Sequence, residues 1–155
     1  MNREPLKRSV SLQPLSHEHH HALVLCRRLR TGIAMHVDEH RMKRYADWFY
    51  EEHLLPHFYT EEQLIFPILG NTHEGVGKAL FEHRRIKRLF VKEKNIIKSL
   101  SLIEEELEKH IRFEERLLFA EIERTATPAQ LADIQRLHQH PPFVENTSDE
   151  FWKCP

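Results

Sequence analysis

Histidine is the most unusual feature of this chain of 155 residues. The sequence contains 13 histidines, more than its 4 glycines, 3 methionines and 2 tryptophans together. Imidazole is the commonest metal ligand among side chains and titrates near neutral pH, so it suits metal binding and proton transfer. What this protein can do therefore depends on where the histidines fall and which carboxylates accompany them.

Two segments repeat one pattern of histidine, glutamate and apolar residues. Residues 57–69 read HFYTEEQLIFPIL and residues 110–122 read HIRFEERLLFAEI, with their histidines 53 positions apart (110 − 57). Both follow H-(F/I)-x-x-E-E-x-L-(I/L)-F-x-x-(L/I). The repeat predicts two helices that present the same face, as in a duplicated helical hairpin.

In each copy a histidine and a glutamate share one helical face. Residues four positions apart are separated by about 40° around a helix axis, which pairs His57 with Glu61 and His110 with Glu114. Each pair is predicted to lie on the apolar stripe of its helix. That stripe is expected to include Leu64, Ile68 and Leu117. An ionisable group buried there without a partner is costly, and a bound cation removes the cost by making both side chains ligands.

Two further helices are predicted to contribute one histidine each. His83 lies in the segment EHRRIKRLF, and the first helix contains EHHHALVLC. His19 matches His83 best, because Glu precedes both and apolar residues follow both, while His20 is the alternative. His53, one turn before His57, is a possible additional ligand or a hydrogen-bond donor behind one.

The predicted donor set is rich in nitrogen. It suits iron better than magnesium or calcium, and it exceeds the four ligands of a tetrahedral zinc ion. Two metal ions bridged by carboxylates use such a set, so a non-haem pair of iron ions is expected. The predicted ligands are His19, His57, Glu61, His83, His110 and Glu114.

Four long helices must position these residues. An all-α, antiparallel up-down-up-down four-helix bundle over about 15–124 is predicted, within a single domain spanning 1–155. The expected helices run from the cap Ser16 to Gly32, from the cap Asp38 to about Leu69 with a kink at Pro56, over 74–98, from the capping box at Ser101 to about Arg124, and from Thr127 to about His138. The tail is expected to be extended and fastened by Phe143, Phe151 and Trp152.

Composition restricts the partners and the compartment. The formal net charge of −1 offers no electrostatic reason to expect nucleic acid or an anionic membrane as partner. Cys26 and Cys154 are too few for a disulfide framework, and no secretion signal or membrane span is recognisable. A cytoplasmic protein, either monomer or homodimer, is expected.

Plainer interpretations cover the remaining polar residues. Cys26 is expected to be a small core residue, and Glu62 and Glu115 to lie on the solvated edges of their helices. The histidines expected at the surface or in loops are His36, His40, His73, His138 and His140. The basic residues expected on solvated outer faces are Arg27, Arg28, Arg84, Arg85, Lys87 and Arg88.

The segments EHHHAL, HFYTEEQLIFP, EHRRI and HIRFEERLLF together resemble the hemerythrin-like (HHE cation-binding) family over roughly residues 15–124. The resemblance implies that Glu61 and Glu114 bridge two irons. It also implies that His57 and His110 are ligands and that His83 and His19 each complete one iron.

The chain departs from the family's oxygen carriers at one position. Those proteins have two histidines four residues apart on the third helix, whereas here the residues four before and four after His83 are Ala79 and Lys87. One iron would then lack a nitrogen ligand unless His53 or another group replaces it. The departure leaves sensing, NO binding and redox chemistry open beside O₂ carriage.

The leading functional expectation is a di-iron protein that binds O₂ or a related diatomic such as NO for sensing, delivery or storage. The main alternative is a di-iron enzyme, peroxidase- or oxidase-like or of the nitric-oxide repair type, with Tyr50 or Tyr59 as proton donor. A third is an iron-sensing or storage module in which metal occupancy governs folding or partner binding.

Overall fold

The computed structural model describes residues 8–138 and 141–153, and all regular secondary structure in these ranges is helical. The prediction of an all-α fold is therefore confirmed. The α-helices are α1 (Gln13–Ala34), α2 (Glu39–Phe49), α3 (Leu55–Thr60), α4 (Glu74–Val91), α5 (Ile96–Phe113), α6 (Phe119–Thr125) and α7 (Pro128–Leu137).

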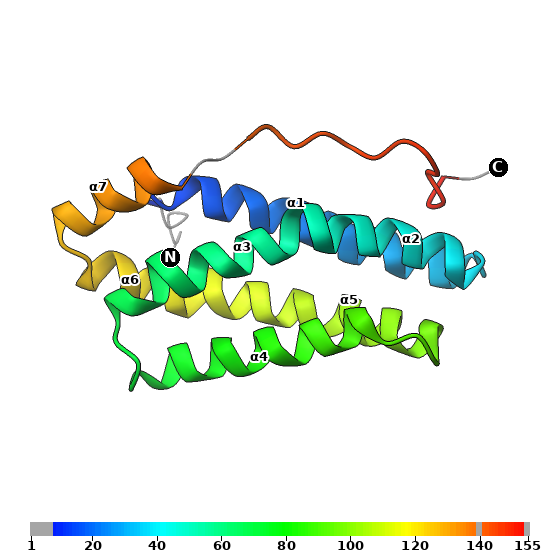
Figure 1. Ribbon diagram of the computed structural model, residues 1–155, viewed down its shortest axis with the longest axis horizontal. Helices are drawn as coiled ribbons and strands as arrows, with labels where there is room; N and C mark the ends of the chain where they lie inside the picture. The colour runs from blue at the N-terminus through cyan, green and yellow to red at the C-terminus, as the bar shows by residue number, and fades with distance from the viewer. Residues whose placement is uncertain (1–7, 139–140, 154–155) are drawn as a thin grey trace, which may run out of the picture.

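Three π-helical segments and one 3₁₀ turn link the shorter α-helices. The π segments are η1 (Tyr50–Leu54), η2 (Glu61–Ile65) and η4 (Glu114–Leu118), and the 3₁₀ turn is η3 (Phe66–Ile68). The chain thus forms four long helical runs in its described part: α1, α2 through η3, α4, and α5 through α6. In Figure 1 the second run is a continuous rod across the η1 junction.

The irregularity expected at Pro56 takes the form of segment η1. Proline has no N–H to donate and its ring crowds the carbonyl one turn earlier. The π turn, which ends just before α3, widens the backbone at that point and lets the helix continue into His57.

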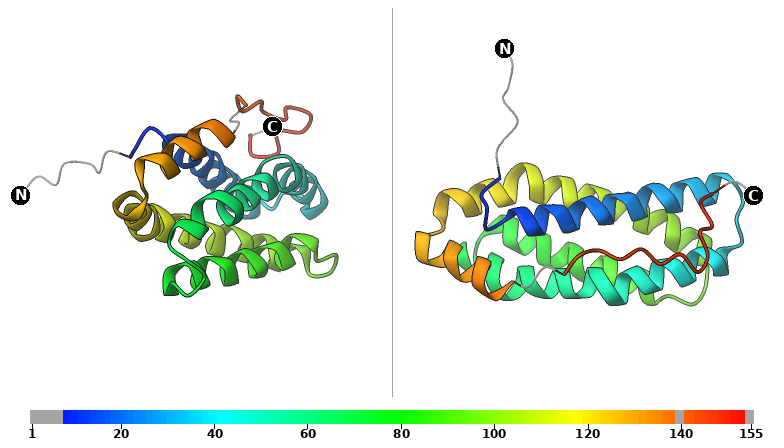
Figure 2. Two further views of the ribbon diagram at one scale, coloured as in Figure 1. Left: turned by 60° about the vertical axis from the view of Figure 1, so that its left-hand side comes forward. Right: turned by 90° about the horizontal axis from the view of Figure 1, so that it is seen from above.

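The long runs lie alongside one another in Figures 1 and 2. Helix α1 packs against α5 and α2, and α4 packs against α5 (Figures 1 and 2). Helix α7 folds back across one end of the molecule, and the C-terminal segment 141–153 runs along the outside of α1 and α2 (Figure 2).

Two of the predicted helix starts are wrong. Helix α1 begins at Gln13, with Pro14 in its first turn and Leu12 at the N-cap, so Ser16 lies inside it. Helix α5 begins at Ile96, after Asn95 in the left-handed conformation (φ 53°), so the Ser101 box is also internal. Helix α4 correspondingly ends at Val91 rather than at residue 98.

Two other predicted caps are confirmed. The carboxylate of Asp38 accepts hydrogen bonds from the backbone N–H groups of His40 and Arg41. Thr127 opens α7 with a capping box in which its hydroxyl and the Gln130 side chain each bond the other's backbone.

Gly32 does not end the first helix, which continues to Ala34. A Cβ atom at this position would lie 2.6 Å from the sulfur of Met42 and 2.7 Å from the ring of Phe151. The residue is glycine because α2 and the C-terminal segment approach the α1 backbone closely here.

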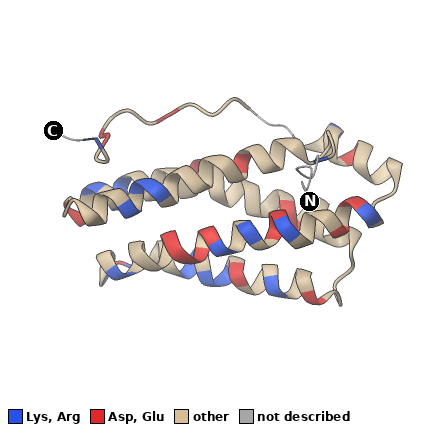
Figure 3. Ribbon diagram, turned by 180° about the vertical axis from the view of Figure 1, so that it is seen from behind, with Lys and Arg blue, Asp and Glu red and all other residues tan. Residues whose placement is uncertain are grey.

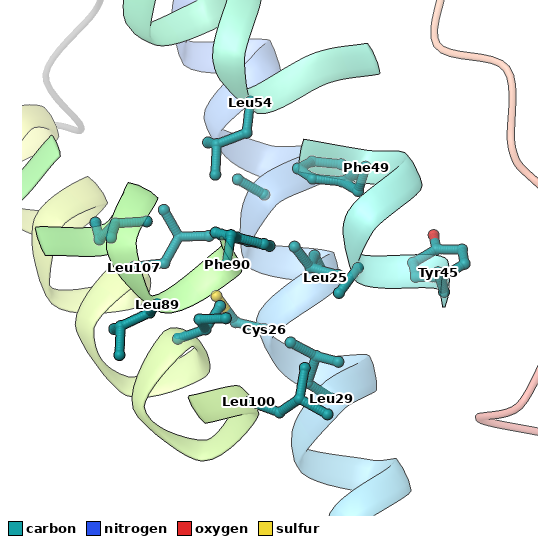
Figure 4. Packing of buried hydrophobic residues seen from close by; sticks show 14 of the residues in the cluster. Leu25, Cys26, Leu29, Tyr45, Phe49, Leu54, Leu89, Phe90, Leu100 and Leu107 are labelled. Atoms are coloured by element: carbon teal, nitrogen blue, oxygen red, sulfur yellow. The ribbon is translucent and has the colours of Figure 1, made fainter. Parts of the chain in front are cut away.

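The apolar core consists of two clusters. One includes Leu25, Leu29, Phe49 and Leu107, several of which Figure 4 shows converging from three helices. The other includes Leu12, Leu15, Ile65, Phe119 and Ile122. On α1 the boundary falls between Leu15 and Ala22, and His19 is the buried polar residue of that interval.

The C-terminal segment is fastened as predicted. Phe151 is 1% exposed within the first cluster, and Phe143 and Trp152 pack against that cluster. Glu145 contacts Arg28 and accepts a hydrogen bond of 2.7 Å from the hydroxyl of Tyr45.

Arg28 is therefore not a solvated residue. Its guanidinium lies 3.8 Å above the ring of Trp152 as well as against Glu145.

Cys26 is a buried core residue, as expected. Burial raises the pKa of its thiol to about 12, which makes the thiol inert. Cys154 lies outside the described residues.

Charged residues of both signs are interspersed along the helices (Figure 3). Some of them form ion pairs between helices, as Arg85 does with Glu106 and Arg30 with Glu104. No helix in the described ranges has the length and apolar character needed to cross a membrane.

The close approach at Gly32 predicts a loss of stability on substitution. We expect Gly32→Ala to lower the free energy of unfolding by roughly 1–3 kcal/mol, because the added methyl group overpacks the contact with Met42 and Phe151. The measurement is urea denaturation followed by circular dichroism.

Gly77→Ala is the matched control, since Gly77 lies in α4 and an added methyl group there would have no neighbouring atom within 4 Å. That variant should be stabilised by about 0.5–1 kcal/mol through helix propensity. Equal stabilisation of both variants would show that the close approach at Gly32 is not a constraint.

Candidate metal centre

Each long helical run contributes one histidine to the polar layer between the two apolar clusters. His19 comes from α1, His57 from α3, His83 from α4 and His110 from α5, and each is at most 5% exposed. The local sequence produces this arrangement because each histidine replaces an apolar residue on the buried stripe of its helix.

Glu61 lies at the centre of the layer and is fully buried. Its carboxylate is 3.2 Å from Nε2 of His83, 3.3 Å from Nε2 of His57 and 3.6 Å from Nε2 of His19. One side chain thus faces imidazoles from three helices.

Glu114 is equally buried and occupies the corresponding position in the second repeat. Its carboxylate contacts Nε2 of His110, and it lies 3.8 Å from Nε2 of His83 and 3.9 Å from Nε2 of His19. The two glutamates therefore face the same small volume.

These side chains form two groups of closely spaced donor atoms. In each group one atom from every residue lies within 4.8 Å of the others, and each group could hold a metal ion. The groups are Glu61, His83, His110 and Glu114, and His19, His57 and Glu61. Glu61 belongs to both, so a carboxylate at this position could contact two ions.

The inward-facing atoms lack normal partners within the described residues. The Nε2 atoms of all four histidines and all four carboxylate oxygens are buried without a well-formed hydrogen bond. Leaving so many buried polar atoms unsatisfied is costly in a folded protein, and a bound cation would satisfy them together.

Three of the histidines make a hydrogen bond through their outward nitrogen to a second carboxylate. Nδ1 of His57 lies 2.7 Å from Glu18, and Nδ1 of His110 lies 2.9 Å from Glu82. In both cases the glutamate directly precedes the histidine of the neighbouring helix, at His19 or His83.

The second glutamate of each repeat completes this outer layer. Nδ1 of His19 lies 2.7 Å from Glu115, and Nδ1 of His83 lies 3.7 Å from Glu62. The expectation that Glu62 and Glu115 lie on solvated edges is wrong. A residue next to an inward-facing one points about 100° away on the helix, toward the adjacent helix as much as toward water.

The four outer pairs close a ring around the site. They join α1 to α3, η2 to α4, α4 to α5 and η4 to α1. A carboxylate behind a ligating imidazole fixes which ring nitrogen faces the metal and strengthens that nitrogen as a donor. The EH dipeptides and the doubled EE of the repeats were the sequence signals for this layer.

Without a metal, protons balance the buried carboxylates. Burial disfavours a charged imidazole at His57, but Glu61 and Glu18 outweigh it and raise its pKa to about 10. Neighbouring carboxylates also outweigh burial at His83 and His110. They raise the pKa of His83 to about 11 and that of His110 to about 9. Burial would raise the pKa of Glu61, yet the positive charge on His57 lowers it well below its usual range.

Both central glutamates open a π-helical segment, and this shifts the buried face by one residue. Ile65 and Leu118 are buried, whereas Leu117 is 61% exposed and Leu64 is partly exposed. The prediction that the apolar stripe continues through Leu64 and Leu117 is wrong, because the wider turn rotates the fourth residue after the glutamate inward.

The alternative histidines are not part of either donor group. His20 is exposed, and His53 belongs to neither donor group. The ring of His53 packs 4.8 Å from Phe143 and 5.2 Å from Trp48, between centroids. Of the two candidates on the first helix, the structure therefore brings His19 to the site.

Among the histidines expected outside the site, His138 is an exception. Its side chain is 7% exposed and its Nε2 lies 3.2 Å from Glu18, so the expectation of a surface residue is wrong. His36 and His40 are exposed, and His73 caps α4 by accepting hydrogen bonds from backbone N–H groups. His140 lies outside the described residues.

The two tyrosines considered as proton donors are not at the site. Tyr59 is 66% exposed, and the ring of Tyr50 stacks on Phe90 with centroids 4.4 Å apart.

Comparison of this chain with protein-family models, with curated proteins and with solved structures found no match.

The outer carboxylates predict a graded effect on metal affinity. We expect Glu82→Gln and Glu115→Gln each to weaken metal binding by about 10–100-fold. The reason is that a neutral amide would no longer orient and polarise the imidazole it contacts, that of His110 or His19. Competition with a chelator of known affinity measures the change.

Glu105→Gln is the control, because Glu105 lies on the outer face of α5 and pairs only with Lys109 among the described residues. Metal affinities that do not differ among the three variants would exclude a role for the outer layer.

Proposed function

We propose that this protein is a non-haem di-iron protein of the hemerythrin-like type that binds O₂ or a related diatomic such as NO, for sensing, delivery or storage. The observation that carries the proposal is the position of Glu61, which belongs to both groups of donor atoms. A carboxylate shared in this way is suited to bridge two ions.

The ring of outer carboxylate–histidine pairs supports an antiparallel four-helix arrangement. It links the four helical runs in chain order and then returns from the last run to α1. Short connections at residues 35–38, 69–73 and 92–95 join successive runs, as an up-down-up-down bundle requires.

The chemistry of the donor set supports iron. Four imidazole nitrogens and two carboxylates form a set of intermediate softness, with more nitrogen than magnesium or calcium sites and more ligands than one zinc ion takes. When bound, a pair of iron ions would supply open coordination positions and electrons for the uptake of a diatomic molecule.

The surrounding aromatic rings support a dry site. Phe58 stacks on His83 with centroids 3.8 Å apart, and Phe119 stacks on His19 at 5.1 Å. Both phenylalanines are at most 1% exposed, so they exclude water from the imidazole faces and hold the rings in place.

The position four residues before His83 also bears on ligand uptake. Ala79 is fully buried and offers no ligand, and Lys87 lies 3.9 Å from Glu62 instead of at the centre. Each donor group thus contains two imidazoles, which leaves positions on both ions for an external molecule.

The first test is elemental analysis of untagged protein together with its visible spectrum in air. About two irons per chain, with near-ultraviolet absorption from a bridged pair, are expected. One zinc per chain, or no metal, would overturn the proposal. A spectrum that returns on cycling between O₂ and vacuum supports a carrier or sensor, whereas turnover of peroxide supports an enzyme.

Single substitutions then identify the ligands. We expect His57→Ala and His110→Ala to lose most of the bound metal, since each removes an inward nitrogen of a different donor group. His40→Ala should retain full metal content, because its side chain is 64% exposed on α2. Equal metal loss in all three variants would show that these histidines are not the ligands.

A further inference from the structure

A partly enclosed cavity of about 180 Å³ lies beside the metal centre, on the side covered by the C-terminal segment. His19, His57 and His110 form part of its wall. The cavity therefore extends from the ligand imidazoles toward the outside of the molecule, between the α1 and α3 helices.

Polar side chains line part of the cavity, among them Glu18, His53 and His138. An apolar part of the wall is made by Ala22, Leu54, Leu107 and Ile111, each at most 3% exposed. These side chains offer no hydrogen bond to water, so an apolar molecule would replace poorly held water there and gain hydrophobic free energy.

Aromatic rings form the sides and the cover. Phe49 and Phe58 line the cavity from within, and Phe143 covers it from the C-terminal segment. Phe143 stacks on His21, with centroids 4.1 Å apart and an interplanar angle of 12°. Flat rings therefore already pack face to face at this wall.

The cover is anchored outside the cavity. Two residues beyond Phe143, Glu145 contacts Arg28 and accepts a hydrogen bond from Tyr45, and Arg41 pairs with Asp149 at 2.7 Å. The segment runs alongside α1 and α2 in the view from above (Figure 2). These contacts anchor the segment that carries Phe143.

We propose that this cavity binds a small apolar molecule with a single aromatic ring, held between Phe143 and the histidine wall. An apolar cavity of about 150 Å³ accommodates benzene, so the volume suits one ring with a short substituent. The ring-lined walls favour an aromatic over an aliphatic molecule through offset and edge-to-face contacts.

The cavity lies beside His57 and His110, which connects it to the proposed function. The effect of a bound molecule on the metal centre rests on that proposed function. A molecule in the cavity would contact the imidazoles of the proposed ligand set, so it would tune the binding of a diatomic molecule at that site. Binding itself depends on the cavity alone.

Toluene and methylcyclohexane are the matched probes, used on the full-length, metal-loaded protein. Calorimetric titration should show saturable binding of toluene, with one site per chain and at least about threefold tighter than methylcyclohexane. Absence of saturable toluene binding would overturn the proposal, and equal affinity for the two probes would overturn the aromatic preference.

Two pairs of variants locate the site. Ala22→Leu fills the inner wall and should abolish toluene binding, whereas the same change at exposed Ala34 should not. Phe143→Ala should weaken binding by about threefold to tenfold, and Val144→Ala, at a position 73% exposed, should leave it unchanged. If Ala22→Leu does not fold, the Phe143 and Val144 pair decides the location.

Metal analysis of the protein as purified, taken together with the toluene titration, separates the two proposals. Toluene binding without any metal in the purified protein would reject the di-iron proposal and keep the cavity. Two irons per chain with no toluene binding would keep the di-iron proposal and reject the proposed binding cavity. A shift of the metal's absorption bands on toluene addition is expected, and unshifted bands at saturation would overturn the contact with the metal centre.

Discussion

The structure depends on the burial of two carboxylates and four imidazoles at one level of the helices. Such groups can be removed from water only together, because each opposite charge or bound cation repays part of the desolvation cost of the others. Every long helical run must bring one histidine to this level, which fixes how the runs lie relative to one another. The outer carboxylates extend the constraint, since each links neighbouring runs through one imidazole.

The polar layer also divides the apolar core. Leu107 packs in one cluster, while Leu118, eleven residues later on the same run, packs in the other. The π segments at Glu61 and Glu114 allow this, because the wider turn returns the apolar face inward after each glutamate. The π-helical turn therefore begins at a glutamate of the candidate site and also determines which apolar residues pack beyond it.

The C-terminal part of the chain contributes His138 and Phe143 to the surroundings of the candidate site. The end of α7 brings His138 against Glu18, which in turn holds His57. Phe143 covers the cavity beside the same imidazole, and its segment is tied down by Glu145 and by Phe151 against Gly32. The cavity beside His57 is therefore lined in part by a segment more than 80 residues away in sequence.

The sequence by itself determined the helical class, the repeated His–Glu faces and the six residues that meet at the centre. It did so because helical periodicity records which side of a helix is buried, and because caps such as Asp38 and Thr127 act within a few residues. Only the tertiary structure decided the partners of Glu18 and Glu115, since periodicity does not say which helix faces a flanking residue. The shift of the stripe to Leu118, the close approach at Gly32 and the cover of Phe143 also depend on contacts between distant segments. Local pattern carries no information on those contacts.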